Sequence, residues 1–201
     1  ATYRGGHRHL DDDFGQTCVA VAWAIPGRAD PRYPVYALLA ELAGGGTASP
    51  LFHQLRDREG LAYSVSCYVD VFADCGLFQI VTSVAPRDVG KVIDGTCREL
   101  CLLARRIDAR DLDRARTQLR THYRRELERP AIIAERIGID LILNGTTAPV
   151  EDVIARIEAT TSDELRAVLK AMIASPPSLA IAGRAAKRAG YERLRKGLAA
   201  V

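Results

Sequence analysis

Runs of apolar residues predict the strands of the chain. Residues 16–24 form a valine-rich run that is short enough for a buried strand. Residues 61–72 alternate, which predicts that one set of side chains shares a face: Leu61, Tyr63, Val65, Cys67, Val69 and Val71. The tetrapeptide ADCG separates this strand from a second apolar run at 77–84, so the pair predicts a β-hairpin. The run at 178–183 predicts one more short strand.

Most of the second half has the apolar spacing of helices. A long amphipathic helix is predicted after Pro86, followed by a second one over 108–128. Residues 132–145 are apolar on nearly every side, which predicts a buried helix that ends at Asn144 and Gly145. Other helices are predicted at 31–42, at 50–59 with Gly60 as a left-handed cap, at 150–159, at 161–173 with Thr161 and Glu164 as a capping box, and at 191–199.

Strands and helices in this order predict the α+β class. We expect one mostly antiparallel sheet with helices packed on one face. The 201 residues contain no linker or low-complexity tract, so residues 1–201 are predicted to form a single domain.

Composition and charge narrow the classes of partner. The 28 basic and 25 acidic residues leave a net charge of +3, which is too small to indicate nucleic-acid binding. No apolar run has the ~18 to 20 residues of a membrane span, and the N-terminus has no signal-peptide pattern. The chain opens without a methionine, which is compatible with its being a piece of a longer protein. We expect a soluble protein.

The five cysteines include no C-x-x-C pair. We therefore interpret them as small buried residues, and their use favours a reducing compartment such as the cytoplasm. A role in metal binding or in a disulfide is the alternative.

The residues that most often carry catalysis are absent or poorly spaced. The four histidines form no H-x-x-E-H motif, and His122 with Glu126 lacks a third zinc ligand. We interpret His122 as a partly buried histidine whose hydrogen bonds are satisfied. The chain also lacks a phosphate-binding loop and a G-x-S-x-G nucleophile motif. Arg116, Arg120 and Arg124 form a stripe that we interpret as a solvated, salt-bridged face, with binding to an acidic partner as the alternative.

One stretch, GGGTASPLFHQLRDREGLAYSV at 44–65, carries a specific resemblance. Together with DCGLFQI in the hairpin and the helices that follow, it resembles the second, non-catalytic half of the zinc peptidases related to pitrilysin, insulin-degrading enzyme and the mitochondrial processing peptidase. The similarity also takes in residues 3–27 and the segment from 149 to the strand SLAIAG. It covers nearly the whole chain in the order of that family.

The resemblance implies a peptidase of two related halves that enclose a peptide. The first half carries an inverted H-x-x-E-H zinc site, and the second supplies an arginine and a tyrosine that reach the peptide. These fall here on Arg56 and Tyr63. No catalytic residue, metal ligand or cofactor is expected in this chain, and zinc is expected in the partner half. From the residues alone, the favoured interpretation is a core aromatic at Tyr63 and an ion pair of Arg56 with Asp57 or Glu59, and the resemblance reverses this preference.

Three functions remain open at this point. The first is a substrate-binding half of a zinc peptidase, whose catalytic half is fused to it or is a separate chain. The second is a structural subunit with the same fold and no proteolysis, like the core subunits of the respiratory cytochrome bc complex. An unrelated basic binding domain is the third. Self-association through a sheet edge or the face without helices is a further expectation.

Overall fold

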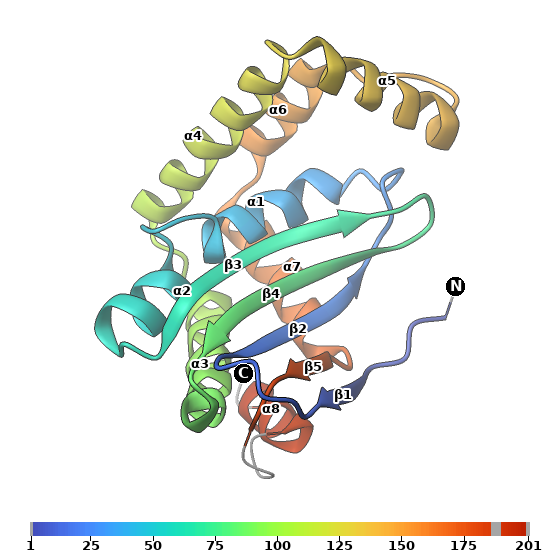
Figure 1. The fold of residues 1–201 in the computed structure, drawn as a ribbon. Coiled ribbons are helices and arrows are strands. Elements are labelled where there is room, and N and C mark those ends of the chain that lie inside the picture. The colour runs from blue at the N-terminus through green and yellow to red at the C-terminus, as the bar shows by residue number, and fades with distance from the viewer. Residues whose placement is uncertain (1, 186–189, 200–201) are drawn as a thin grey trace.

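The structure, a computed structural model, describes residues 2–185 and 190–199, and its centre is a five-stranded sheet. The strands lie in the order β1-β5-β2-β4-β3 (Figure 1). Only the pair of β1 and β5 is parallel, so the prediction of a mostly antiparallel sheet is confirmed. The strands are β1 (Gly6–Leu10), β2 (Thr17–Ile25), β3 (Ala62–Val71), β4 (Gly76–Val84) and β5 (Ser178–Ala182).

Strand β1 was not predicted from the apolar pattern. Its sequence, GHRHL, is polar, and Leu10 is exposed. A strand at the edge of a sheet pairs on one side only and often carries charged side chains, so no run of apolar residues marks it. The polar residues 7–9 therefore belong to a strand that the apolar pattern does not mark.

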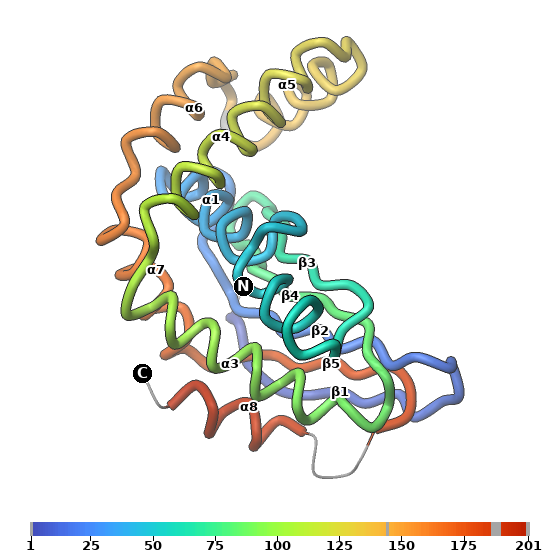
Figure 2. The backbone as a smooth tube through the Cα atoms, turned by 90° about the vertical axis from the view of Figure 1, so that its left-hand side faces the viewer, coloured from blue at the N-terminus to red at the C-terminus, as the bar shows by residue number. Residues whose placement is uncertain are grey.

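One face of the sheet is buried and the other is largely open. Along β2 the side chains of Val19, Val21 and Trp23 are buried, whereas Cys18 on the opposite face is exposed. Strand β4 alternates in the same register with β2, because Trp23 lies opposite Phe78. The helices pack against the buried face, as Figure 2 shows from the side, which confirms the expected layer of helices.

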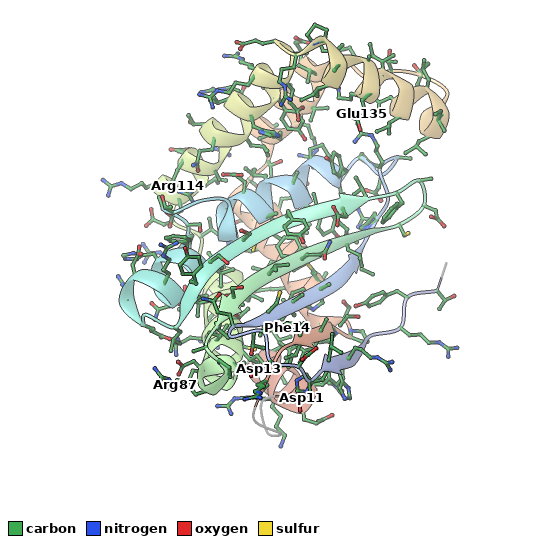
Figure 3. The ribbon with its side chains drawn as sticks, in the orientation of Figure 1. Asp11, Asp13, Phe14, Arg87, Arg114 and Glu135 are labelled. Carbon is green, nitrogen blue, oxygen red and sulfur yellow. The ribbon has the colours of Figure 1, made fainter. Side chains whose placement is uncertain are left out.

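The helices follow the predicted order. They are α1 (Tyr33–Gly44), α2 (Pro50–Phe52), α3 (Val89–Arg105), α4 (Ala109–Glu126), α5 (Pro130–Asn144), α6 (Val150–Ala159), α7 (Ser162–Ala174) and α8 (Tyr191–Leu198), with a 3₁₀ turn, η2 (Pro86–Asp88), before α3. The hydroxyl of Thr161 accepts a hydrogen bond from the backbone N–H of Glu164 at 3.2 Å, which confirms the predicted helix start. Arg114 of α4 donates to the carbonyl of Leu42 at 3.2 Å and so connects α4 to α1 (Figure 3).

The segment after α2 differs in type from the prediction. Residues His53–Arg58, η1, form a π-helix rather than a continuation of an α-helix. Its bond runs from the backbone N–H of Glu59 to the carbonyl of Gln54, five residues earlier, at 3.1 Å. Gly60 follows with a φ of +61°, so the left-handed end is confirmed.

Helix α5 was predicted to be buried, and this is wrong. It extends beyond the body of the molecule between α4 and α6 (Figure 1), and Ile142 is 82% exposed. Three large apolar side chains share the outward face: Ile137, Leu141 and Ile142. The apolar pattern identified the helix correctly, but the other described elements contact only one of its sides and leave the other exposed. Within the described residues, no helix has the length and apolar character needed to cross a membrane.

An ion pair connects α5 to the loop before α1. The guanidinium Nε of Arg28 donates to Oδ1 of Asp140 at 2.8 Å, and the Asp140 side chain is 7% exposed. The guanidinium also lies 5.6 Å from the ring centre of Tyr33. This ion pair holds α5 against the body of the molecule.

We predict that Asp140→Ala loosens α5 and leaves the rest of the fold intact. Hydrogen bonds between charged groups contribute about 1.5–3 kcal/mol, so amide exchange across α5 should become roughly 10- to 100-fold faster. Hydrogen-exchange mass spectrometry measures this helix by helix. Glu135→Ala on the same helix (Figure 3), an exposed side chain with no ion pair among the described residues, is the control. Equal exchange in both variants would contradict the role of the ion pair.

Candidate functional site

The two residues singled out by the sequence lie side by side. The guanidinium carbon of Arg56 is 5.6 Å from the centre of the Tyr63 ring and 4.9 Å from the centre of the Phe52 ring. Arg56 comes from η1 and Tyr63 from the start of β3. We call these three residues the Arg56 cluster. A guanidinium near the faces of two rings is held by cation–π attraction and loses much of its freedom of movement.

Tyr63 points away from the core because β3 is irregular at this residue. Ala62 lies opposite Val84 and Ser64 lies opposite Ser83, so Tyr63 is the extra residue of a β-bulge. The bulge shifts the alternation by one position: Ala62 and Val65 are buried, and Tyr63 is 69% exposed. The prediction that Tyr63 shares a face with Val65 is therefore wrong, and so is the alternative of a core aromatic.

Arg56 is also free of the ion pairs that were the alternative reading. Asp57 instead contacts His53, with Oδ2 at 3.3 Å from Nδ1, and Glu59 pairs with Arg98. Within the described part of the chain, neither the Arg56 guanidinium nor the Tyr63 hydroxyl has a hydrogen-bond partner. Both groups are exposed at the surface, so their donors are available to a ligand.

The backbone is irregular on both sides of the Arg56 cluster. Arg56 stands in a π-helix and Tyr63 in a bulge, and each irregularity changes the direction of the side chain it carries. Insertions of this kind occur preferentially at functional sites. The arrangement can offer two fixed hydrogen-bond donors to one acceptor, such as a peptide carbonyl.

The histidines take separate positions. A ring nitrogen of His9 lies 2.8 Å from the carbonyl oxygen of Gly183, and His7 stacks on Tyr191. His122 lies beside Glu126, with Nε2 and Oε1 3.1 Å apart, but its side chain is 66% exposed, so the prediction of partial burial is wrong. In the residues that the structure describes, no three His, Cys, Asp or Glu side chains lie close enough to hold a metal ion.

The arginine stripe and the cysteines match their interpretations in part. Arg116 pairs with Asp113 at 3.1 Å and Arg120 with Glu158 at 3.0 Å, as a salt-bridged face requires. Three thiols are buried, and burial raises the pKa of Cys97 to about 12, so that thiol stays protonated and unreactive. Cys18, by contrast, is exposed, which the interpretation as a buried residue did not anticipate.

A cavity of about 1400 Å³ lies between α5 and the body, and the sequence did not indicate it. Its walls come from α1, α4, α5, α6 and the middle of β3, and they combine apolar with charged side chains. Glu41 of α1 is half-buried in this wall, and burial raises the pKa of its carboxyl group. None of the three residues of the Arg56 cluster lines the cavity, so it is a separate feature.

Comparison with known proteins gives consistent results. The model of the peptidase M16 inactive domain matches residues 2–119. An uncharacterized zinc protease of Streptomyces coelicolor is 35% identical over 166 residues, which are 81% of this chain and 36% of that protein. The alpha subunit of the bovine mitochondrial-processing peptidase is 26% identical over 156 residues, which are 78% of this chain and 30% of the subunit.

Two solved structures have the same fold. A chain of complex III2 from Candida albicans superposes with a TM-score of 0.89 at 18% identity, covering 97% of this chain and 49% of its own length. The peptidase M16 inactive domain from Pseudomonas fluorescens superposes with a TM-score of 0.80 at 19% identity, covering 91% of this chain and 44% of its own length. The present chain spans less than half the length of each of these relatives.

We predict that Glu41→Gln raises the melting temperature at pH 7 more than at pH 4. Because the folded state raises the pKa of Glu41, stability falls as the pH rises from the ordinary glutamate pKa through the folded one. The glutamine cannot ionise, so it avoids this loss. Thermal melts of both proteins between pH 4 and 7 measure the difference. The exposed Glu128→Gln should show no such growth with pH, and a parallel response of the two variants would contradict the prediction.

Proposed function

Because the chain belongs to the family of peptidase M16 inactive domains, we propose that it is the substrate-binding, non-catalytic half of a zinc-dependent peptidase. The observation that carries this proposal is the Arg56 cluster. It places two exposed donors next to one another at two backbone irregularities, and neither donor has a hydrogen-bond partner among the residues that the structure describes. The carboxylates beside Arg56 in the sequence are engaged elsewhere, Asp57 with His53 and Glu59 with Arg98.

The two donors suit the chemistry of peptide hydrolysis. The carbonyl oxygen of a peptide gains negative charge in the tetrahedral transition state, and fixed N–H and O–H donors stabilise that charge. In this proposal Arg56 and Tyr63 bind the peptide from one side, while a catalytic half attacks it from the other. We assign the zinc ion to the catalytic half, since the described residues offer no ligand set for it. That half is either fused to this chain or a separate subunit.

A second function is favoured by one observation. The chain of complex III2 from Candida albicans superposes on 97% of this chain. A structural subunit that keeps the fold without proteolysis is therefore the alternative proposal. It makes no use of the free donors of Arg56 and Tyr63, so substitutions there separate the two functions. The third possibility, an unrelated basic domain, has no support in the family membership.

We propose that the outward face of α5 contacts the catalytic half. The face carries Ile137, Leu141 and Ile142 without a charged side chain between them, and it is exposed in the described structure. The matched part is 36% of the Streptomyces coelicolor relative and 49% of the complex III2 chain, which leaves room in each for a second half. Burying these side chains on association would remove apolar surface from water. Self-association through the same face or through the sheet edge is the competing outcome.

The compartment we propose is a reducing one such as the cytoplasm, because the cysteines are free thiols.

We predict that Tyr63→Phe and Arg56→Lys lower the activity of the assembled peptidase. Phenylalanine keeps the ring beside Arg56 but removes the hydroxyl, and lysine lacks the planar fork of donors. Loss of one donor to the transition state typically costs about 3 kcal/mol, so kcat/KM should fall on the order of 10- to 1000-fold. The measurement is cleavage of a fluorogenic peptide by this chain together with a half that bears the inverted zinc motif.

Tyr68→Phe is the matched control, because Tyr68 is an exposed tyrosine on the same strand. Melting temperatures of all variants should agree, which excludes unfolding as the cause. If Tyr63→Phe and Arg56→Lys hydrolyse peptide at the wild-type rate, the Arg56 cluster has no part in binding and the structural alternative is preferred.

We also predict that Ile142→Glu weakens association with the catalytic half. A carboxylate on the outward face of α5 would have to lose its water on binding, whereas in the free chain it stays exposed. Analytical ultracentrifugation of the mixed halves measures the change, which should be at least about tenfold in Kd. Leu102→Glu, an equally drastic substitution at an exposed position on α3, is the control. Equal association of both variants would place the contact elsewhere.

A further inference from the structure

The segment that carries Arg56 is seated on the middle of α3. Leu55, the residue before Arg56, is fully buried and points at Gly95 of α3. A Cβ added to Gly95 would lie 2.5 Å from Cδ2 of Leu55, closer than two carbon atoms can approach without bonding. The absence of a side chain at Gly95 therefore provides the space that Leu55 occupies.

A glycine at this place is costly for α3. Gly95 is a buried interior residue of a 17-residue helix, where glycine is about 1 kcal/mol less favourable than alanine. The contrast is Gly138 of α5, where an added Cβ would have no atom within 4 Å. Of these two glycines, only Gly95 has a side chain of another segment packed into its space.

A polar contact ties the end of the same segment to the same turn of α3. Glu59 pairs with Arg98, which is three residues after Gly95. The side chain of Gln54 donates to Oε1 of Glu59 at 2.6 Å. Helix α3 therefore contacts this segment at two points, an apolar one at Leu55 and a charged one at Glu59, and Arg56 lies between them in the sequence.

We propose that Gly95 is a positioning residue for the Arg56 cluster and that it acts through Leu55. The activity measurement described below assumes the proposed peptide-binding function, whereas the NMR measurement does not. With Leu55 in the space beside Gly95, η1 takes the π-helical course that brings the Arg56 guanidinium between Phe52 and Tyr63. A side chain at residue 95 pushes Leu55 outward, and because Arg56 is the next residue, its guanidinium leaves the two rings.

The test compares Gly95→Ala with Gly138→Ala in the full chain. The first readout is the NMR signal of the Arg56 guanidinium, which Arg56→Lys identifies by its disappearance. The ring currents of Phe52 and Tyr63 shift this signal in the wild-type chain. In Gly95→Ala it should move toward the position of exposed arginines, and in Gly138→Ala it should not move.

The second readout is activity of the chain with its catalytic half. Displacement of a binding group by about 1 Å can cost up to ~100-fold in rate, so kcat/KM of Gly95→Ala should fall by roughly tenfold or more. The double variant Gly95→Ala/Leu55→Val removes the clashing Cδ2, so it should recover both the NMR shift and the rate. A purely structural loss of stability would not be reversed by making the core smaller.

The outcomes separate this inference from the proposed function. A displaced Arg56 signal with unchanged hydrolysis supports the positioning role and contradicts the role of Arg56 in binding peptide. An unmoved signal in Gly95→Ala, or a double variant that recovers nothing, overturns the positioning role. If Gly95→Ala does not fold, Glu59→Gln releases the second point of attachment and should move the same signal by a smaller amount. No movement in that variant likewise overturns the inference.

Discussion

The two-residue alternation of side chains along β2 and β4 is the constraint on which the rest of the structure depends. Trp23 and Phe78 face each other across these strands, and both belong to the one buried face. Because successive side chains point to opposite faces, the buried apolar residues of the two strands meet the helices, and Ala20 and Ala22 lie on the other side with the partly exposed Leu77 and Val81. One covered face and one open face follow from this pattern alone.

The candidate site arises where this alternation is interrupted. The bulge at Tyr63 adds one residue to β3, and the π-helix adds one to the turn before it. Each change rotates a side chain that the regular pattern would direct elsewhere, and together they bring Arg56 and Tyr63 to one place on the surface. The interruption leaves the core intact, because Ala62 and Val65 fill the positions on either side of Tyr63.

Much of this fold is predictable from the sequence, because the signals are local. The hairpin, the start of α7 at Thr161 and the left-handed Gly60 each depend on a few neighbouring residues. The sequence could not reveal the bulge or the π-helix, because no local residue pattern marks either one, and the nearby contact of Leu55 with Gly95 joins segments that are distant along the chain. For the same reason the side chain of Tyr63 was placed on the wrong face. Helix α5 shows a different limit: its pattern establishes that it is apolar, but only the assembled structure shows that its outward face is uncovered.

The charges around the Arg56 cluster explain why its donors remain free. Asp57 and Glu59 are the nearest carboxylates along the chain, and each could form an ion pair with Arg56 that would compete with a ligand. His53 engages the first and Arg98 the second, while the two rings attract the guanidinium without using its hydrogens. An arginine held in this way keeps its charge and its donors, and a ligand that binds it displaces no hydrogen-bond partner from residues 2–185 and 190–199. The free energy of binding is then not reduced by the loss of an existing ion pair. An arginine without an ion pair to lose suits ligand binding better than a structural role. The packing of η1 on α3 supports this arrangement, because Glu59 pairs with Arg98 of α3 and not with Arg56.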